Sequence, residues 1–520
     1  MKDEVYRLAK PKKKGLLQLI FSRFLLIVVL ILLQVAILWG LYQGIVEAVP
    51  YLRGLQYAFT LVMIVYLFNS GMDSTAKLTW MFIIAFLPLP GAALLLFTQT
   101  DAGHRQVKDR VARQIADTKD ILPQDESVRR RLEQDGSGTD DLCTFLNRSG
   151  CFPVFGGTEA TYLPTGEATF AALLEELKKA EKYIFLEFFI IEEGYMWGEV
   201  LRVLEQKVLE GVDVRVLYDG MCEVTKLPVG YRKKLIARGI RTKAFSAIRP
   251  LVSSHYNYRD HRKIAVIDGR VAFNGGVNLA DEYINRVTLF GHWKDAAVML
   301  KGEAVKSFTL MFLQTWNMDE REPVYEPYLA DGEKAGDAEG FVMPYADCPL
   351  DDYKVGETVY IDILNRANDY VHIMTPYLIL DGELEAAIRY AAQRGVDVKI
   401  ILPGIPDKKM AYALAKSHYR SLVSAGVGLY EYTPGFLHSK VFVSDGRKAV
   451  VGTINLDYRS LYHHFECATY LYRAPCIADV EADFQETLAR CRRVTPETIK
   501  AEKPFYKVAG SLMKFVAPLM

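Results

Sequence analysis

The chain carries one eight-residue pattern twice, and this repetition restricts its fold more than any other feature of the sequence. Residues 261–268 read HRKIAVID and residues 438–445 read HSKVFVSD. Each copy is followed by a glycine and then by a Gly-x-x-Asn stretch, at 275–278 and 452–455. Side chains alternate between the faces of a β-strand, so the His and Lys of each copy should point to the same side. One such motif is typical of a solvated surface strand, whereas two copies with the same tail indicate a shared chemical task.

The surroundings of the motifs are repeated as well. The stretch GVDVRVL at 211–217 has a similar counterpart, GVDVKII, at 395–401, and such pairs lie 184 to 187 positions apart. His261 and His438 lie only 177 positions apart. The first half therefore holds about ten extra residues just before its motif, at 248–260, and extra length beside a motif strand is typical of a substrate-facing loop.

Short β-branched or aromatic runs alternate with amphipathic stretches, which predicts an α/β fold. In the first half we expect helices at 170–179, 198–210 and 231–238, and strands at 183–191, 212–218 and 240–245, before the motif strand. We expect two pseudo-repeated lobes, each a mixed sheet flanked by helices, at 151–325 and 342–498, joined by a linker at 326–341. Neither lobe has a complete reaction centre of its own, so both motifs should face one cleft.

The N-terminal part, residues 1–100, should anchor the chain in a membrane. Its apolar segments lie at about 17–43, 48–69 and 78–98. The run 24–42 has no charged residue, and as a helix it rises roughly 28 Å, about the thickness of the hydrocarbon core. A cleaved signal peptide is the alternative, but the run is too long and lacks a cleavage site of small residues. Pro88 and Pro90 make the third segment either a kinked span or a hairpin of two half-helices.

Basic residues on both sides of these segments predict the topology. Lysines at 10 and 12–14 precede the first segment. The last segment is followed by His104, Arg105, Lys108, Arg110 and Arg113. By the positive-inside rule both flanks face the cytoplasm, which requires an even number of crossings. We therefore expect two full spans and a hairpin-like third segment, with three full spans as the alternative, and the lobes on the cytoplasmic face.

Two further segments flank the lobes. Residues 101–150 are charged and lose their apolar periodicity, so we expect a linker with some amphipathic helix. In the tail, 499–520, one helical face carries Phe505, Val508, Leu512, Phe515 and Val516. This helix either lies on the membrane, with Lys507 and Lys514 near lipid head groups, or packs on its own domain.

Two histidines that face one phosphate can divide the work of transferring it. One imidazole attacks phosphorus, while the other protonates the leaving alcohol and then deprotonates the incoming one. The motif lysines would neutralise the phosphoryl oxygens, and the asparagines of the trailing stretches would donate hydrogen bonds to them. The candidate residues are His261, Lys263, Asn278, His438, Lys440 and Asn455. Because no acidic cluster has metal-ligand spacing, we expect no metal and no other cofactor.

A nucleophilic histidine needs an anion on its second ring nitrogen, which selects the tautomer. Asp295 and Glu466 follow the two motifs at comparable distances and are candidates for this role, with ordinary strand residues as the alternative. Asp268 and Asp445 complete the catalytic motifs, but each begins a turn with the glycine after it, which favours a structural role in orienting the motif strand. The histidines expected at the surface or with satisfied hydrogen bonds are His255, His292, His372, His418, His463 and His464.

Composition narrows the class of partner. The 63 basic and 63 acidic residues cancel, so no basic surface predicts nucleic-acid binding. The seven cysteines include no C-x-x-C pair, which favours reduced thiols on the cytosolic side.

The duplicated HxKxxxxD motif with its trailing Gly-x-x-Asn resembles the phospholipase D superfamily, and within it the bacterial cardiolipin synthases. Supporting stretches are KLTW at 77–80, NYRDHRK at 257–263, NLADEY at 278–283, WKD at 293–295 and NLDYRS at 455–460. Gly276 and Thr453 stand where the superfamily often has serine, and we expect both to support phosphate binding.

The resemblance implies two phospholipase D-like lobes behind membrane helices, with His261 as nucleophile and His438 as acid and base. It also implies that each downstream acid supports the histidine of the other lobe, so that Asp295 serves His438 and Glu466 serves His261. The implied reaction joins two phosphatidylglycerol molecules into cardiolipin and glycerol at the bacterial cell membrane. The expected partners are phosphatidylglycerol and membrane lipids.

Alternatives that keep the same intermediate change the acceptor. Water would make the protein a phospholipase D, serine would make it a phosphatidylserine synthase, and another polyol would make it a related phosphatidyltransferase. A membrane-anchored nuclease and an inactive scaffold are further alternatives. Neutral composition argues against the nuclease, and intact residues at both motifs argue against the scaffold.

Overall fold

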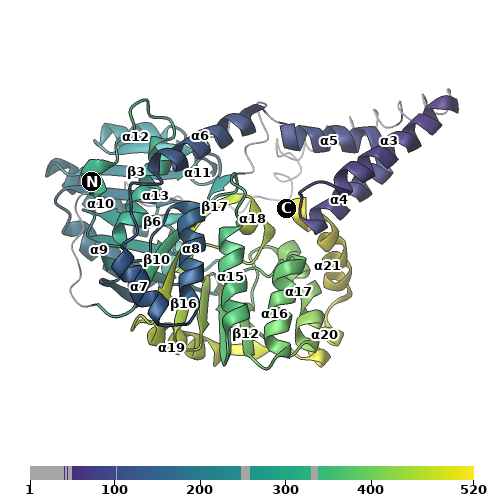
Figure 1. The fold of residues 1–520 in the computed structure, drawn as a ribbon. Helices are drawn as coiled ribbons and strands as arrows, with labels where there is room; N and C mark the ends of the chain where they lie inside the picture. Colours follow the sequence, from purple (N-terminus) through teal and green to yellow (C-terminus); the bar gives the residue numbers. More distant parts are fainter. Residues whose placement is uncertain are drawn as a thin grey trace. The chain divides into compact units, whose positions relative to one another are not determined.

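The computed structural model describes residues 50–100, 102–246, 258–329 and 338–519, together with Gly40 and Gly44. The chain divides into two compact units, Met1–Thr100 and Asp101–Met520, and both motifs belong to the second (Figure 1).

The described part of the first unit consists of three apolar helices. These are α3 (Pro50–Phe68), α4 (Ser74–Phe86) and α5 (Pro88–Thr100). Asp73 caps α4 by accepting hydrogen bonds from the amides of Thr75 and Ala76. Pro88 begins α5, a position where the missing N–H costs no helical hydrogen bond. The third apolar segment therefore forms two helices of 13 residues each, as in the hairpin alternative.

Among the described residues, only α3 is long and apolar enough to cross a membrane. Its span Tyr51–Phe68 has 18 residues and is only 6% buried. Leu67 of α3 packs with Trp80, Ile84, Ala92 and Leu95 of the two shorter helices. The expected first segment, 17–43, lies outside the described residues, so the number of crossings stays a prediction.

The second unit contains two mixed sheets with equivalent strand orders. The first is β1 (Thr158–Leu163), β9 (Ala297–Gly302), β7 (Val271–Gly275), β6 (Lys263–Ile267), β2 (Tyr183–Phe188), β3 (Asp213–Asp219) and β4 (Arg241–Phe245). The second is β10 (Phe341–Asp347), β17 (His464–Tyr472), β16 (Lys448–Gly452), β15 (Val441–Ser444), β11 (Tyr370–Met374), β12 (Asp397–Pro403), β13 (Gly428–Tyr432) and an extra edge strand, β18 (Cys491–Arg493). The last three strands of the first sheet are parallel, as are β11, β12 and β13, and the other neighbours are antiparallel. This confirms the mixed α/β architecture and the expected strands at β2, β3 and β4.

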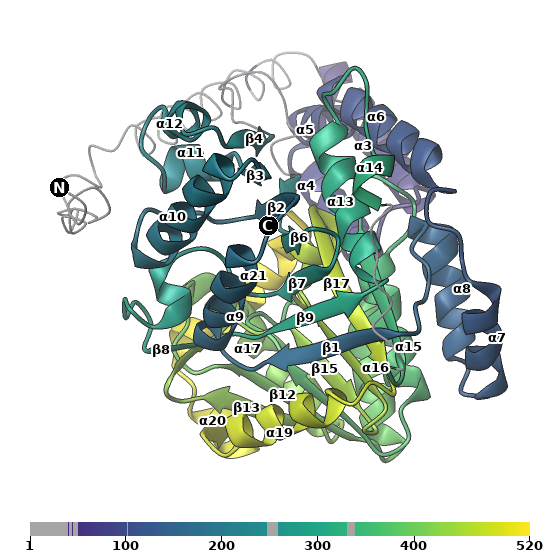
Figure 2. The ribbon, with the colours of Figure 1, turned by 90° about the vertical axis from the view of Figure 1, so that its left-hand side faces the viewer.

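Helices flank both sheets, whose strands lie in the centre of the unit (Figure 2). Along the chain, α9 (Gly166–Lys178), α10 (Tyr195–Leu209) and α12 (Tyr231–Ala237) lie between strands of the first sheet, and α13 (Val305–Asn317) follows its strand β9. The helices between strands of the second sheet are α15 (Val355–Arg366), α16 (Gly382–Gln393), α17 (Lys409–Ser424) and α19 (Ile477–Leu488). Helix α13 contacts strands of both sheets, and its Phe308, Phe312 and Trp316 are buried. One continuous apolar core therefore joins the two sheets.

Two short parallel pairings connect the halves of this unit directly. Strand β5 (Arg259–Asp260), just before the first motif, pairs with β17 of the second sheet. Strand β14 (Gly435–Leu437), just before the second motif, pairs with β8 (His292–Lys294) of the first half. Each motif is thus attached by its backbone to a strand from the other half.

The segment 101–150, expected to be a linker with some amphipathic helix, is largely helical. It forms α6 (Ala102–Thr118), α7 (Glu126–Gln134) and α8 (Thr139–Gly150). Val128 and Leu132 of α7, and Leu142 and Leu146 of α8, are buried in the main core. Each pair is spaced i, i+4 and shares one helical face, whereas the charged residues that masked this pattern lie on the other faces. In the expected linker at 326–341, α14 (Glu326–Leu329) is helical and residues 330–337 lie outside the described residues.

The C-terminal tail forms α20 (Pro496–Ala501), α21 (Pro504–Val516) and the short η3 (Ala517–Leu519). Helix α21 packs against α17, and a Cβ on Gly510 would lie 2.3 Å from the carbonyl oxygen of Ala413. Its opposite face is open, with Phe505, Val508 and Leu512 exposed by 58%, 61% and 67%. The helix therefore packs on its own domain and also presents an apolar face.

We expect Gly510→Val to lower the free energy of unfolding by roughly 1–3 kcal/mol, because the added side chain must separate α21 from α17. Ser511→Val is the matched control, since it places the same residue on an exposed position of the same helix. Denaturant unfolding in detergent micelles measures both variants. Equal midpoints for the two would contradict the close contact at Gly510.

Candidate active site

The motif histidines lie immediately before their strands rather than within them. Strand β6 begins at Lys263 and β15 begins at Val441. The expectation that His and Lys share one face of a strand was therefore wrong in detail. Each motif lysine nevertheless contacts its own motif histidine, because its ammonium group donates a hydrogen bond to the backbone carbonyl oxygen of that histidine.

Each motif histidine is held by the half of the unit to which it does not belong. The amide of His261 donates to the carbonyl of Phe465 over 2.9 Å, and the amide of His438 donates to the carbonyl of Lys294 over 2.7 Å. These acceptors directly precede the acids Glu466 and Asp295 in the sequence. The backbone pairing therefore sets each imidazole beside one carboxylate.

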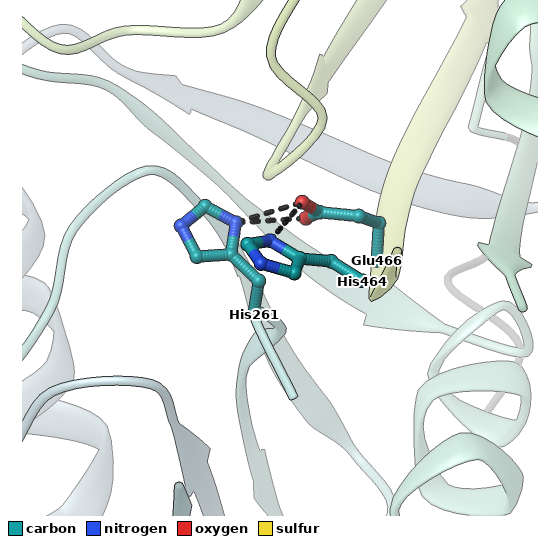
Figure 3. Close-up of side chains that lie close together, drawn as sticks. All are labelled: His261, His464 and Glu466. Carbon is teal, nitrogen blue, oxygen red and sulfur yellow. Dashed lines mark hydrogen bonds and ion pairs between the residues drawn. The ribbon is translucent and has the colours of Figure 1, made fainter. Parts of the chain in front are cut away.

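The side chains complete this reciprocal pairing. Nδ1 of His261 lies 2.9 and 3.0 Å from the two carboxylate oxygens of Glu466, as Figure 3 shows. Nδ1 of His438 lies 2.7 Å from Oδ2 of Asp295. Both carboxylates are fully buried, so neither acid is an ordinary strand residue. The partners are those that the family resemblance implied.

The carboxylates determine which ring nitrogen is reactive. Burial raises the pKa of Glu466, but its contacts with His261 and His464 hold it well below the usual value. Burial also opposes ionisation of Asp295, yet contacts with His438 and Lys440 leave its pKa lowered. An ionised carboxylate accepts a hydrogen bond from Nδ1–H, so Nε2 of each imidazole keeps its lone pair.

Burial and positive charge keep the imidazoles neutral. Burial, followed by the nearby Lys440, lowers the pKa of His438 to about 4, and burial lowers the pKa of His261 well below 6.5. Burial also lowers the pKa of Lys263 to about 8 and that of Lys440 to about 7. The charge of Lys263 contributes to the shifts of both His438 and Lys440, so the two motifs lie within electrostatic reach of each other. With neutral imidazoles and two lysines, the site is suited to bind an anion.

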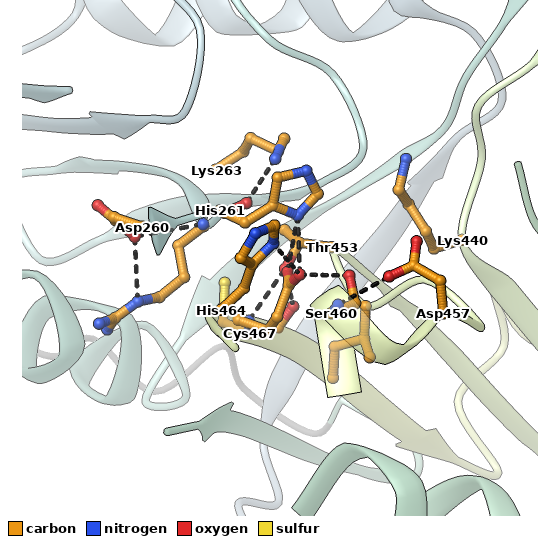
Figure 4. A network of polar contacts seen from close by, with 12 residues as sticks. Asp260, His261, Lys263, Lys440, Thr453, Asp457, Ser460, His464 and Cys467 are labelled. Carbon is orange, nitrogen blue, oxygen red and sulfur yellow. Dashed lines mark hydrogen bonds and ion pairs between the residues drawn. The ribbon is translucent and has the colours of Figure 1, made fainter. Parts of the chain in front are cut away.

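Glu466 is the centre of a wider hydrogen-bond network, and its partners Thr453 and Ser460 are labelled in Figure 4. Its carboxylate accepts hydrogen bonds from the hydroxyl of Ser460, over 2.6 Å, and from the hydroxyl of Thr453. His464 lies 3.6 Å from the same carboxylate. Thr453, expected to support a phosphate, donates instead to the carboxylate that orients His261.

Gly276 occupies the corresponding position in the first half, and the structure explains the missing side chain. A Cβ on Gly276 would lie 2.0 Å from Oδ1 of Asp295. The carboxylate that orients His438 fills the space that the threonine side chain uses in the second half. The two carboxylates are therefore supported differently.

The two motif asparagines also differ. Asn278 accepts from the amide of Ile190 and donates to the hydroxyl of Tyr283, over 2.8 and 2.7 Å, so most of its hydrogen-bonding capacity is used within the protein. The side-chain oxygen of Asn455 is buried and has no hydrogen-bond partner among the described residues. A phosphate contact by either asparagine stays a prediction.

The aspartates of the motifs lie outside the reaction centre. Asp268 accepts from the amides of residues 181–183, just before and at the start of β2, and Asp445 accepts from those of residues 368–370, at the start of β11. Both have a positive φ, 53° and 55°, in the turns that their glycines allow. These contacts support the structural role that the turns favoured, and a catalytic role for either aspartate stays a prediction.

His464 is the site residue that the sequence reasoning missed. It was expected to be satisfied or at the surface, but it is buried, and neither ring nitrogen has a hydrogen-bond partner among the described residues. Its ring centroid lies 5.2 Å from that of His261. The available signal was its position two residues before Glu466, which places both side chains on one face of β17.

Aromatic rings surround the imidazoles. Phe189 lies 5.0 Å from His261, while Trp293 and Tyr283 lie 5.3 and 5.4 Å from His438, measured between ring centroids. These rings limit the movement of the imidazoles and exclude water from their edges.

Two groups of side chains have the spacing of metal ligands. Their members are His261, His464 and Glu466, and Glu357, Asp381 and Glu383, with ligand atoms within 4.8 Å of one another. In the first group Glu466 already accepts from its histidine and two hydroxyls. In the second, the ammonium of Lys354 lies 3.5 Å from Glu357 and 3.6 Å from Glu383 and supplies the positive charge. The expectation that the chemistry needs no metal stays a prediction.

Comparison with known proteins gives a consistent result. The family model described as "Cardiolipin synthase, PLD-like domain" matches residues 173–316 and 360–488. A cardiolipin synthase of Alkalihalophilus pseudofirmus is 32% identical over 90% of this chain and 94% of its own, and one of Geobacillus kaustophilus is 36% identical over 73% and 76%. An uncharacterized protein of Streptococcus mutans is 55% identical over 88% and 99%. The crystal structure of a phosphatidylserine synthase from Haemophilus influenzae shares the fold, with a TM-score of 0.53, 16% identity, and coverage of 69% and 95%.

We expect Gly276→Ala to displace the Asp295 carboxylate from His438 and to lower the turnover number at least tenfold, because the imidazole loses the partner that selects its tautomer. Gly382→Ala is the matched control, since a Cβ at Gly382 meets no atom within 4 Å. Turnover of the lipid substrate by both variants, with their unfolding midpoints, makes the comparison. A fully active Gly276→Ala enzyme would contradict the crowding at Asp295.

Proposed function

Because this chain belongs to the family of cardiolipin synthases with phospholipase D-like domains, we propose that it transfers a phosphatidyl group between two phosphatidylglycerol molecules, giving cardiolipin and glycerol. The observation that carries this proposal is the pair of imidazoles, each oriented by a buried carboxylate, beside two buried lysines. Such a site attracts a phosphodiester and offers it both a nucleophile and a proton carrier.

In the first step, Nε2 of His261 attacks the phosphorus atom of the donor lipid. The N–P bond forms as the bond from phosphorus to the glycerol oxygen breaks, and His438 gives a proton to the departing glycerol. The bound phosphodiester carries a negative charge, which raises the pKa of His438 so that the imidazole can hold this proton. The products of the step are a phosphatidyl-histidine and free glycerol.

In the second step, His438 is neutral and accepts the proton of a hydroxyl on the acceptor lipid. The new O–P bond forms, the N–P bond breaks, and His261 returns to its starting state. Lys263 and Lys440 stabilise the charge on the phosphoryl oxygens in both steps. Glu466 and Asp295 keep each imidazole in the reactive tautomer throughout.

We infer that the two halves of the second unit are pseudo-repeated lobes that arose by duplication. Their equivalent strand orders and the repeated sequences at 211–217 and 395–401 support this. The lobe at 151–325 supplies His261 and Asp295, and the lobe at 342–498 supplies His438 and Glu466.

We also propose that residues 1–100 anchor the enzyme in the cell membrane, with two full spans and the hairpin α4–α5, and with the lobes on the cytoplasmic face. The exposed apolar surface of α3 and the two short helices support this arrangement. A diacyl lipid leaves the bilayer only at a cost of about 0.8 kcal/mol for each exposed CH₂ group, so the enzyme has to work at the membrane surface.

Product analysis tests the proposed reaction. Purified protein in mixed micelles with phosphatidylglycerol should form cardiolipin and glycerol, measured by mass spectrometry. Phosphatidic acid as the main product would contradict the proposal and indicate a phospholipase D, and preferred use of added serine would indicate a phosphatidylserine synthase.

We expect His261→Ala to abolish the covalent phosphatidyl-enzyme, whereas His438→Ala should still form a small amount of it from a donor with a good leaving group. His418→Ala is the matched control, because His418 is also buried against a carboxylate, that of Glu385 over 2.8 Å, but is not part of the site. Acid-quenched mass spectrometry locates the phosphoryl group. Its recovery on His438 would reverse the two roles.

The lysines predict the pH dependence. Their pKa values of about 7 for Lys440 and about 8 for Lys263 mean that the empty site loses positive charge as the pH rises through this range. We therefore expect kcat/KM for the anionic lipid to fall at least fivefold between pH 7 and pH 9, whereas kcat should change less because bound phosphate keeps the lysines protonated. Initial rates over a range of lipid mole fractions give both parameters. A kcat/KM that stays constant to pH 9 would contradict the shifted lysines.

A further inference from the structure

A cavity of about 340 Å³ lies in the second half of the unit. It is lined by Ile379, Lys408, Ala411, Asp457, Arg459 and Ala517, among others. These residues take no part in the two proposed transfer steps.

The wall of this cavity is connected to the catalytic network. Oδ1 of Asp457 accepts from the amide of Ser460 over 2.8 Å, and the hydroxyl of Ser460 donates to Glu466 over 2.6 Å. Figure 4 shows Asp457 beside Lys440 at the edge of the site. The cavity wall is therefore linked through Ser460 to the carboxylate that orients His261.

Two cations in the lining make the cavity suitable for an anion. The side chain of Lys408 is 68% exposed, and its ammonium lies 3.1 Å from the hydroxyl of Tyr377 and 3.7 Å from the carboxylate of Asp407. That carboxylate already accepts from Tyr377 over 2.7 Å. Arg459 is exposed, and its guanidinium has no ion pair among the residues that the structure describes. Neither charge is fully neutralised within the protein.

Apart from Asp457 and the rings of Tyr377 and Tyr458, the remaining lining is apolar, and it includes a residue of the segment that follows α21. Ile379, Ala411 and Ala517 form part of the wall, and Ala517 belongs to η3, which directly follows α21. The open face of α21 carries the exposed Phe505, Val508 and Leu512. A ligand that matches both features is an anion with an apolar tail, which is an anionic phospholipid.

We propose that this cavity binds the acceptor lipid, with Lys408 and Arg459 on its phosphodiester and with its head-group hydroxyl directed to the reaction centre. This inference rests on the proposed phosphatidyl transfer. In the second step the hydroxyl of this lipid forms the new O–P bond, its proton passes to His438, and the N–P bond to His261 breaks. Holding the acceptor in place favours transfer to the lipid over transfer to water.

The test compares two activities of one preparation. Cardiolipin formation needs a lipid acceptor, whereas exchange of isotope-labelled glycerol into phosphatidylglycerol needs only the donor site and free glycerol. We expect the double variant Lys408→Gln/Arg459→Gln to lose at least tenfold in cardiolipin formation and less than twofold in glycerol exchange. Lys409→Gln/Arg420→Gln is the matched control, since both residues are exposed on α17 and do not line the cavity.

Equal loss of both activities in the double variant, or no loss of cardiolipin formation, would overturn the assignment. A wild-type enzyme that shows neither activity would instead refute the proposed function itself. Water-soluble glycerophosphoglycerol distinguishes a lipid from a free phosphodiester, and we expect it to serve as acceptor at less than a tenth of the rate of the lipid. If it matches the lipid, the cavity recognises the phosphodiester alone and the assignment to a lipid is wrong.

Discussion

The site depends on one constraint, which is that each imidazole is held by a carboxylate from the other half of the unit. Glu466 contacts His261 and Asp295 contacts His438, and a backbone hydrogen bond fixes each pair. Neither half can therefore orient its own histidine. Burying an ionised carboxylate costs free energy unless the carboxylate accepts hydrogen bonds. The hydroxyls of Thr453 and Ser460 donate such bonds to Glu466 and so offset this cost.

The arrangement explains how a site with several ionisable groups stays ready for an anionic substrate. Burial disfavours every charge, and the carboxylates stay ionised because the imidazoles and lysines contact them. The pKa of His438 is lowered to about 4, so its imidazole is neutral at pH 7. The pKa of Lys440 is lowered to about 7, so its ammonium group is partly deprotonated near neutral pH. An incoming phosphodiester supplies the missing negative charge, so substrate binding and protonation of the site favour each other.

The two halves have diverged around this common plan. The first uses Gly276 to make room for its carboxylate, and the second uses the hydroxyl of Thr453 to hold one. The second half also contributes His464 to the site and has a cavity lined by two cations. Chemically unequal halves fit a reaction in which one histidine carries the phosphatidyl group and the other carries the proton.

The sequence by itself determined the mixed α/β architecture, the strands β2, β3 and β4, and the histidines, lysines and acids of the site, because alternating side chains and a repeated motif are local patterns. Only the tertiary structure decided which residues from distant parts of the sequence come into contact, because local patterns carry no information about such contacts. Asp268 and Asp445 look catalytic in the motif but cap loops, since their partners are backbone amides some 75 to 87 positions away. His464 entered the site, and 101–150 became part of the core, because packing of distant segments determines which faces are buried.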